Sequence, residues 1–256
     1  MGNLVELKKT SFVVLEKKGL VDVKANIVMI ADTSGSTYHL YNSGIMQESM
    51  ERLLGLGLNM DLNKSIEVFT FANTHAHIGN ANEGNVNNFV KNVLLRKTSI
   101  GGGTRYAGVM NEVLGKFGKE IKFEEVTIEK EQGFFGKLFG KKPEVTTFQK
   151  PVAIEQSKVP TIVFFLTDGN NHDPAQTAQL IRETADQPVF WQFVGLGNES
   201  FEFLEMLDEM EGRFIDNANF FQLNDISKIS DKELYERLLN EVPSWLKEAK
   251  EKNILA

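Results

Sequence analysis

Short apolar runs recur along the chain and predict buried strands. They span residues 25–31, 66–72, 161–167 and 189–196, and they are rich in Val, Ile and Phe with little alternation of polar positions. Continuous apolar runs of this kind are typical of strands that helices cover on both faces.

Between these runs, apolar residues return with the spacing of a helix. This spacing covers residues 45–58, 86–93, 107–117 and 203–210. Strands and helices therefore alternate along the chain. The alternation predicts an α/β fold of the doubly wound type, with a mostly parallel central sheet and helices on both faces.

Helix-start signals add local detail. Asp173 directly precedes a proline, so we expect its carboxylate to cap the helix that begins there. Ser230 and Glu233 have the spacing of a capping box and predict a last helix over residues 231–241. Pro243 then ends or restarts that helix.

One segment departs from the alternation. Residues 118–159 are charged and β-prone, and we interpret them as an inserted arm that resembles a β-hairpin. About 40 residues are too few to build an independent core without metals or disulfides. The predicted organisation is an N-terminal extension over residues 1–23 and one domain over residues 24–250 that carries the insertion.

Composition narrows the function classes. The chain has no cysteine, which excludes disulfides, thiolate metal sites and cysteine nucleophiles. A formal net charge of −7 repels polyanions, so we expect no nucleic-acid partner. No apolar run approaches the roughly 18–20 residues that span a bilayer. Glu6 and Glu16 interrupt the first residues, unlike a secretory signal, so we expect a cytoplasmic protein.

The candidate chemistry begins where the first predicted strand ends. Asp32, Ser34 and Ser36 alternate, so their oxygen atoms can converge on one point in a loop that continues the strand. Carboxylate and hydroxyl oxygens are the ligands of hard cations such as magnesium, manganese or calcium. The alternative is a serine-rich turn whose hydroxyls cap the next helix.

Two later loops favour the metal hypothesis. A glycine run at residues 101–103 leads to the hydroxyl of Thr104, and Asp168 follows the apolar run at 161–167. In a doubly wound sheet, loops at the carboxyl ends of the strands form the ligand crevice. We therefore expect these loops to meet.

These residues resemble the von Willebrand factor A (vWA) domains and their metal-ion-dependent adhesion site (MIDAS). The matching positions, in order, are Asp32, Ser34, Ser36, Thr104 and Asp168. The resemblance implies that the serines, and in one state the threonine, bind the metal directly, while the aspartates act through water. It also implies a divalent cation, Mg²⁺ before Mn²⁺ or Ca²⁺, and a protein partner that presents Asp or Glu. The expected partner-binding residues are Thr37, Gly103, Gly169, Asn170, His172, Phe134 and Phe135.

Within the family, the chain is similar to bacterial vWA proteins of tellurium-resistance and stress-response operons. The segments that carry this likeness are the early Leu-Lys-Lys, the Asp32–Ser36 loop and residues 69–72. The resulting hypothesis is a cation-dependent interaction module without enzymatic activity. The alternatives are an adaptor of a ring-forming ATPase and, from another class, a metal-dependent hydrolase that uses metal-bound water.

Other motifs were weighed against simpler interpretations. His75 and His77 invite a zinc hypothesis, but no third ligand stands nearby in the sequence, so a polar edge strand is favoured. The lysine and glycine pattern near Lys137 is one residue short of a phosphate loop and is rejected. Residues 134–142 mix Phe and Lys, which permits contact with an anionic membrane, although a hairpin tip is favoured.

Overall fold

The computed structural model describes residues 2–119, 121–129, 145–154, 159–169 and 171–256. For residue 2 and for residues 121–129 and 145–154 it describes the backbone only. The chain divides into two compact units, residues 1–118 with 157–256, and residues 119–156. Among the described residues, no helix is long and apolar enough to cross a membrane.

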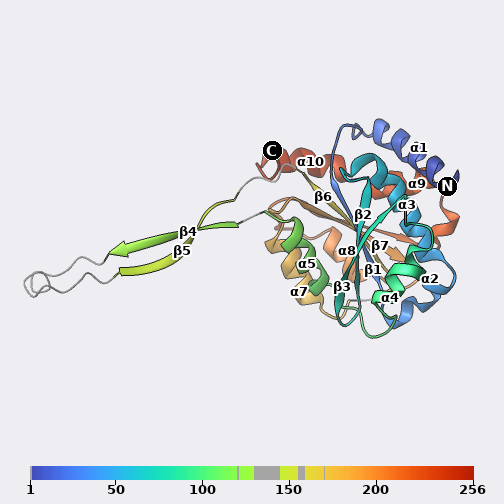
Figure 1. Cartoon of the computed structure of the whole chain (residues 1–256), viewed down its shortest axis with the longest axis horizontal. Helices are drawn as coiled ribbons and strands as arrows, with labels where there is room; N and C mark the ends of the chain where they lie inside the picture. The colour runs from blue at the N-terminus through green and yellow to red at the C-terminus, as the bar shows by residue number, and fades with distance from the viewer. Residues whose placement is uncertain (1, 120, 130–144, 155–158, 170) are drawn as a thin grey trace, which may run out of the picture. The chain divides into compact units, whose positions relative to one another are not determined.

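The larger unit is built on a six-stranded sheet with the order β3-β2-β1-β6-β7-β8 (Figure 1). Five strands are parallel, and β3 pairs antiparallel with β2 at one edge. This arrangement confirms the predicted α/β class. The strands are β1 (Asn26–Asp32), β2 (Ser65–Phe71), β3 (His75–Asn82), β6 (Thr161–Thr167), β7 (Val189–Leu196) and β8 (Ala218–Leu223).

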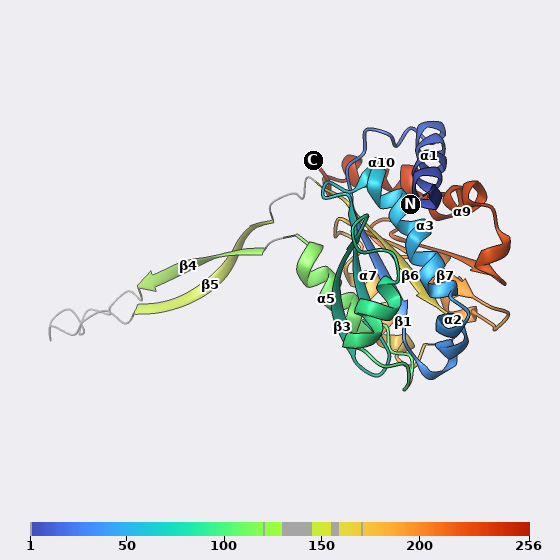
Figure 2. The same ribbon diagram turned by 45° about the vertical axis from the view of Figure 1, so that its right-hand side comes forward.

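Helices cover both faces of this sheet, as Figures 1 and 2 show. One core contains Ile27 and Met29 of β1 with residues of α1, α3, α9 and α10, and the other contains Val28 and Ile30 with residues of α5, α7 and α8. The helices are α1 (Gly2–Lys17), α2 (Tyr38–Asn42), α3 (Ile45–Met60), α4 (Leu95–Lys97), α5 (Ala107–Phe117), α7 (Pro174–Glu183), α8 (Glu202–Asp208), α9 (Asp231–Leu238) and α10 (Val242–Glu251).

The smaller unit contains β4 (Ile121–Glu129) and β5 (Val145–Ile154), which pair antiparallel. This pairing agrees with the expected hairpin-like arm. Phe134, Phe135 and the rest of the segment 130–144 lie outside the described residues.

Several local expectations need correction. Residues 2–17 form a helix that the sequence pattern did not predict. The predicted last helix ends at Leu238, and α10 starts anew with Pro243 in its first turn. The segment 86–93 is a turn followed by a π-helical segment over Val90–Leu94. Ser230 does cap α9, accepting a hydrogen bond from the Glu233 backbone N–H.

At both edges of the sheet, side chains make hydrogen bonds to backbone groups of the edge strands. Asp208 Oδ1 accepts a hydrogen bond from the backbone N–H of Phe220 in β8 at 3.3 Å. At the other edge, Lys97 Nζ donates to the carbonyl of Ile78 in β3 at 2.7 Å. His75 and His77 lie on β3, which is the polar edge strand that the sequence favoured.

The packing of α1 on the larger unit depends on a glycine. A Cβ atom at Gly55 of α3 would lie 2.7 Å from the Leu7 Cβ of α1 and 2.7 Å from the Tyr235 Oη of α9. The Gly55 carbonyl also accepts a buried hydrogen bond from Ser11 Oγ at 2.8 Å. The three helices therefore meet where only a hydrogen atom fits.

We expect Gly55→Ala to lower the free energy of unfolding by about 1–3 kcal/mol, because the added methyl group overpacks this contact. Gly115→Ala is the matched control, since Gly115 also lies in a helix but a Cβ there meets no atom within 4 Å. Better helix propensity should make that variant up to about 1 kcal/mol more stable. Urea unfolding measures both, and equal effects would contradict the packing argument.

Asp208, Asp216 and Glu241 form a group of carboxylates around Arg213 that affects the stability of the fold. The buried guanidinium of Arg213 pairs with Asp216 at 2.6 Å and donates to the Asp208 carbonyl at 2.8 Å. Burial, together with the charges of Asp208 and Asp216, raises the pKa of Glu241 to about 7. Burial likewise raises the pKa of Asp208 to about 6. Arg213 is therefore the positive charge shared by Asp208, Asp216 and Glu241, and protonation of one of these acids reduces the repulsion among them.

The pH dependence of stability follows from the raised pKa of Glu241. Its contribution to stability is present below its ordinary pKa of 4.5 and is lost as the pH rises through about 7. We expect Glu241→Gln to raise the free energy of unfolding at pH 8 and to change little at pH 4.5, as measured by urea unfolding across this range. Glu211→Gln removes an equal charge from an exposed position. A pH profile that is the same for both variants would refute the assignment.

Candidate functional site

The candidate site lies at the carboxyl ends of β1 and β6, where buried strands emerge into loops. Asp32 is the last residue of β1, and Asp168 directly follows β6. The two strands are neighbours in the sheet, so their ends adjoin. A 3-10 turn over Gly35–Thr37 then folds the chain after β1 back toward β6.

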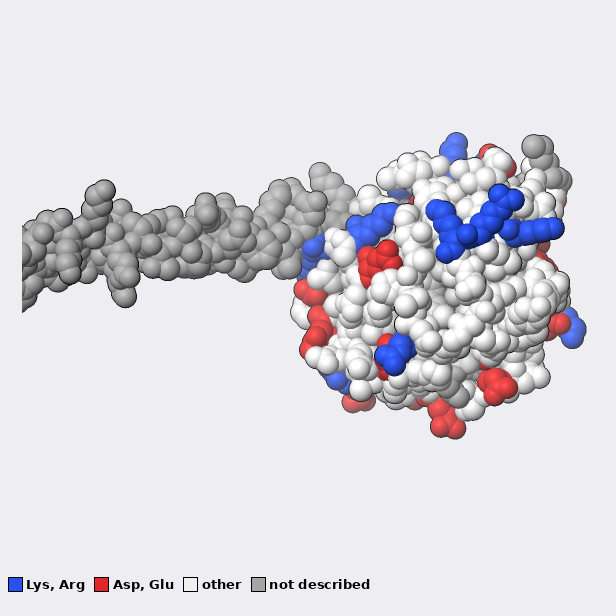
Figure 3. All heavy atoms as spheres, turned by 60° about the horizontal axis from the view of Figure 1, so that its bottom comes forward, with Lys and Arg blue, Asp and Glu red and all other residues white. Residues whose placement is uncertain are grey.

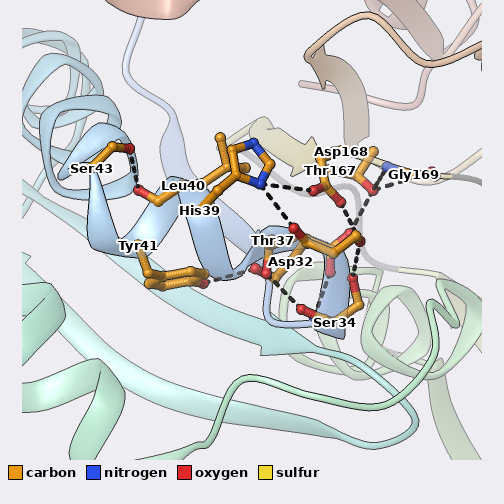
Figure 4. Close-up of polar contacts among 11 residues, drawn as sticks. Asp32, Ser34, Thr37, His39, Leu40, Tyr41, Ser43, Thr167, Asp168 and Gly169 are labelled. Atoms are coloured by element: carbon orange, nitrogen blue, oxygen red, sulfur yellow. Dashed lines mark hydrogen bonds and ion pairs between the residues drawn. The ribbon is translucent and has the colours of Figure 1, made fainter.

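Asp32 is fully buried, and both of its carboxylate oxygens and its backbone carbonyl accept hydrogen bonds. Its Oδ1 accepts a hydrogen bond from the Ser34 backbone N–H at 2.7 Å, and its Oδ2 accepts one from Thr167 Oγ1 at 2.7 Å. The hydroxyl of Tyr41 donates to its carbonyl at 2.8 Å (Figure 4). Burial nevertheless raises the pKa of Asp32 to about 6. The neutral hydrogen-bond donors around the carboxylate offset only part of the cost of burying its negative charge.

Three further oxygen atoms form a short chain beside Asp32. Ser34 Oγ lies 3.1 Å from Ser36 Oγ, and Ser36 Oγ donates to Asp168 Oδ1 at 2.7 Å (Figure 4). His39 Nδ1 contacts the Ser36 carbonyl at 2.9 Å and lies 3.9 Å from Asp168 Oδ2. The alternation of Asp32, Ser34 and Ser36 thus brings their oxygens toward one region, as the sequence predicted.

The glycine loop brings Thr104, another predicted ligand, to the same cleft. The Gly101 N–H donates to the Thr33 carbonyl at 2.8 Å, and the Gly35 N–H donates to the Gly102 carbonyl at 3.2 Å. These bonds join the glycine loop to the Asp32–Ser36 loop. The hydroxyl of Thr104 makes no hydrogen bond with a described residue, and Thr104 lines the same cleft as the serines.

The cleft has a volume of about 550 Å³ and lies between these loops and the end of β7. No Lys or Arg stands among the described residues that line it: Ser34, Ser36, His39, Gly102, Gly103, Thr104, Asp168, Gly169, His172, Leu196, Gly197, Asn198 and Glu199. Burial raises the pKa of Asp168, and the charge of Glu199 raises it further. Within the described lining, the carboxylates therefore have no Lys or Arg beside them. Figure 3 turns the lower side of the molecule of Figure 1 forward and shows a broad uncharged area, with scattered Asp and Glu side chains and several Lys and Arg side chains gathered toward the top of the view.

The predicted partner-binding residues separate into three groups. Gly103, Gly169 and His172 line the cleft. Thr37 does not, because it is fully buried and its Oγ1 donates to the Ser34 carbonyl at 2.8 Å, so it closes the turn and has no surface for a partner. Asn170, with Phe134 and Phe135, lies outside the described residues.

Asp173 has a different role from the one its sequence position suggested. It makes no side-chain cap at α7. Its Oδ1 accepts a hydrogen bond from the Tyr106 N–H at 2.9 Å, and its Oδ2 accepts one from the Ala107 N–H at 3.2 Å. Asp173 therefore caps α5, the helix that follows Thr104.

Sequence reasoning missed several supporting residues. Tyr106 Oη donates to the Gly169 carbonyl at 2.9 Å and lies 3.2 Å from Thr167 Oγ1, which links α5 to the Asp168 loop. Asn73 Oδ1 accepts a hydrogen bond from the Gly103 N–H at 2.9 Å. Thr167 was the one with a sequence signal, since a threonine ends an otherwise apolar strand.

The donor set suits a hard divalent cation. Among the described residues, no group of three or more His, Cys, Asp or Glu side chains is placed to hold a metal, and the cleft instead gathers the hydroxyl-bearing residues Ser34, Ser36 and Thr104 beside Asp168. Neighbouring ligands of an octahedral Mg²⁺ at about 2.0–2.1 Å lie about 2.9 Å apart. The separation of 3.1 Å between the hydroxyls of Ser34 and Ser36 is close to that spacing. The hydrogen bond of 2.7 Å from Ser36 to Asp168 fits a carboxylate that orients a ligand from outside the ion's first contacts.

Fold and site together define a class, the vWA domains. The solved structures that the chain resembles include proximal thread matrix protein 1 from the mussel byssus, in crystal form 2 at 15% identity with a TM-score of 0.53, and in a form with a zinc-occupied MIDAS motif at 16% identity with a TM-score of 0.50. Both alignments cover 87% of this chain, but only 49% and 47% of those proteins, respectively.

The sequence identifies the family more narrowly. Residues 24–128 and 124–255 match the family described as "vWA-TerF-like: vWA found in TerF C terminus", and the chain belongs to this family. It is also 35% identical over 248 residues to the uncharacterized protein YcbR of Bacillus subtilis, which covers 97% of this chain and 88% of YcbR.

Thr167 provides a test of how Asp32 is held. We expect Thr167→Val to lower the free energy of unfolding in chelator at pH 7.5 by about 1–3 kcal/mol, because it removes a buried hydrogen-bond donor from a carboxylate. Thr167→Ser keeps the hydroxyl and should lose less. Urea unfolding measures both, and a valine variant as stable as the serine variant would show that Asp32 does not need this donor.

Proposed function

We propose that this protein is a divalent-cation-dependent protein-interaction module. The observation that carries the proposal is the chain of oxygens from Ser34, Ser36 and Asp168 at one open cleft that Thr104 also lines, next to the buried carboxylate of Asp32. Ser34, Ser36 and Thr104 would hold the ion directly, while Asp32 and Asp168 would act through water. The ion would supply an electrophilic position that a partner's carboxylate can take.

Charge supports a cation at this place. The carboxylates of Asp32 and Asp168 both have raised pKa values because of burial, and the described cleft lining offers no Lys or Arg to neutralise them. A divalent ion would supply the missing positive charge. The zinc-occupied MIDAS of the mussel protein supports divalent-cation binding in this fold, and we propose Mg²⁺ first, with Mn²⁺ or Ca²⁺ as alternatives.

Binding without turnover is the second part of the proposal. A hydrolase would need a base within reach of metal-bound water. The two histidines at the cleft each use Nδ1 on a backbone group, His39 on the Ser36 carbonyl and His172 on the Thr104 N–H. This arrangement supports a structural use of both rings. We therefore propose a partner that presents Asp or Glu and no chemical step.

The biological setting is the third part. The family description refers to TerF, and this supports a role in a bacterial tellurium-resistance or stress-response system. We propose that the module acts in the cytoplasm of such a system.

The cation site is tested by thermal unfolding in chelator and then in millimolar MgCl₂, MnCl₂ or CaCl₂. An ion at ten times its dissociation constant should stabilise the fold by about 1.4 kcal/mol, or about 3–6 °C for a chain of this size. We expect Ser36→Ala to abolish the rise. Ser43→Ala, an equal change on an exposed hydroxyl next to α2, should keep it. No rise with any ion, confirmed by titration calorimetry, would overturn the proposal.

The partner class is tested with immobilised random peptides that contain Asp or Glu and with matched peptides that contain Asn or Gln. We expect retention of the acidic peptides in Mg²⁺ or Mn²⁺ and release in chelator. Ser36→Ala should not retain them. Equal retention of acidic and amide peptides would show that the cleft does not select a carboxylate.

A further inference from the structure

The segment that carries Thr104 is held by parts of the chain that are distant in sequence. The Gly103 N–H donates to Asn73 Oδ1 at 2.9 Å, and the Arg105 N–H donates to the Ala72 carbonyl at 3.1 Å. Asp173 takes the N–H groups of the next two residues, Tyr106 and Ala107. A run of glycines would otherwise have wide conformational freedom. The backbone on both sides of Thr104 is therefore fixed without an ion.

Thr104 itself is held by one residue, His172. The Thr104 N–H donates to His172 Nδ1 at 3.2 Å, and the His172 backbone N–H donates to the Thr104 carbonyl at 2.7 Å. A backbone N–H only donates, so His172 Nδ1 is the acceptor in this bond. One side chain and its own backbone thus fix both peptide groups of Thr104.

The imidazole of His172 also explains why position 103 is a glycine. A Cβ atom there would lie 2.6 Å from His172 Nδ1 and 3.0 Å from Asn73 Oδ1. The backbone at Gly103 does not have a positive φ, so a side chain is excluded by this contact and not by backbone strain. The ring and the glycine loop are packed against each other.

We propose that His172 is a positioning residue that sets the Thr104 hydroxyl toward the cleft before the cation arrives. Three observations support this role: the paired bonds to Thr104, the close packing on Gly103, and a Thr104 hydroxyl with no bond to a described residue. The inference rests on the proposed cation site. If it is correct, the loop after β6 has two roles at the site. It carries Asp168 itself, and through His172 it orients the hydroxyl of Thr104, which lies in the loop before α5.

The test compares wild type with His172→Ala, His172→Asn and His172→Gln. The amide oxygen of Asn reaches about the position of Nδ1, whereas that of Gln reaches about the position of Nε2. We expect His172→Ala and His172→Gln to weaken Mn²⁺ binding about tenfold by titration calorimetry, the effect typical of outer contacts to metal ligands. His172→Asn should stay within about threefold of wild type.

A second readout does not need the ion. In chelator, hydrogen exchange of the Thr104 amide, followed by NMR, should be faster in His172→Ala and His172→Gln than in wild type and His172→Asn. Gly103→Ala should also speed this exchange, and its effect should shrink in the His172→Ala background because the two changes disturb one contact.

The outcomes separate this inference from the proposed function. If wild type binds no ion yet the Thr104 amide shows the expected exchange pattern in chelator, the proposed cation-dependent function is wrong, whereas the positioning of Thr104 by His172 is supported. If wild type binds Mn²⁺ and His172→Asn is as weak as His172→Ala, or if all variants exchange at the wild-type rate, His172 does not position Thr104. Loss of peptide binding in His172→Ala with unchanged Mn²⁺ affinity would also overturn it, because the ring would then act on the partner.

Discussion

The structure depends on one constraint, the burial of the central strands on both faces. Because β1 and β6 are covered by a helix layer on each side, their side chains stay almost entirely apolar until the strands end. Polar groups can then appear only in the loops at the carboxyl edge. Asp32, Thr167 and Asp168 are the first polar residues after these strands' apolar interiors, and their crowding follows from the architecture. The site is thus a consequence of the sheet, and the loops supply its details.

Features with a local cause could be predicted from the sequence. Buried parallel strands are continuous apolar runs, and the alternation of Asp32, Ser34 and Ser36 is visible without any contact information. Helix α1 was missed because Val5, Phe12 and Val13 are half exposed and obscure its buried stripe. Strand β8 was missed because Ala218–Leu223 is a short edge strand that is buried in part.

Contacts between distant segments could not be predicted in this way. Asp173 has the local signal of a cap for α7, but its oxygens lie on the N–H groups of α5, because the fold brings that helix start nearer to them. The contacts of Asn73 and His172 with the glycine loop join segments whose proximity depends on the order of the strands in the sheet. The sequence therefore indicated the oxygen-bearing residues of the candidate site, and the structure added the residues that hold them in place.

The way in which side chains occupy the sheet edges has a consequence for behaviour at high concentration. An open edge strand offers backbone groups to any other strand and is a common starting point for aggregation. Here Asp208 occupies an amide of β8, and Lys97 occupies a carbonyl of β3. Burial raises the pKa of Asp208 to about 6, so the ionisation of Asp208 near neutral pH lowers the stability of the fold, although the same carboxylate occupies the amide at the sheet edge. Solubility and stability are thus opposed in a single side chain.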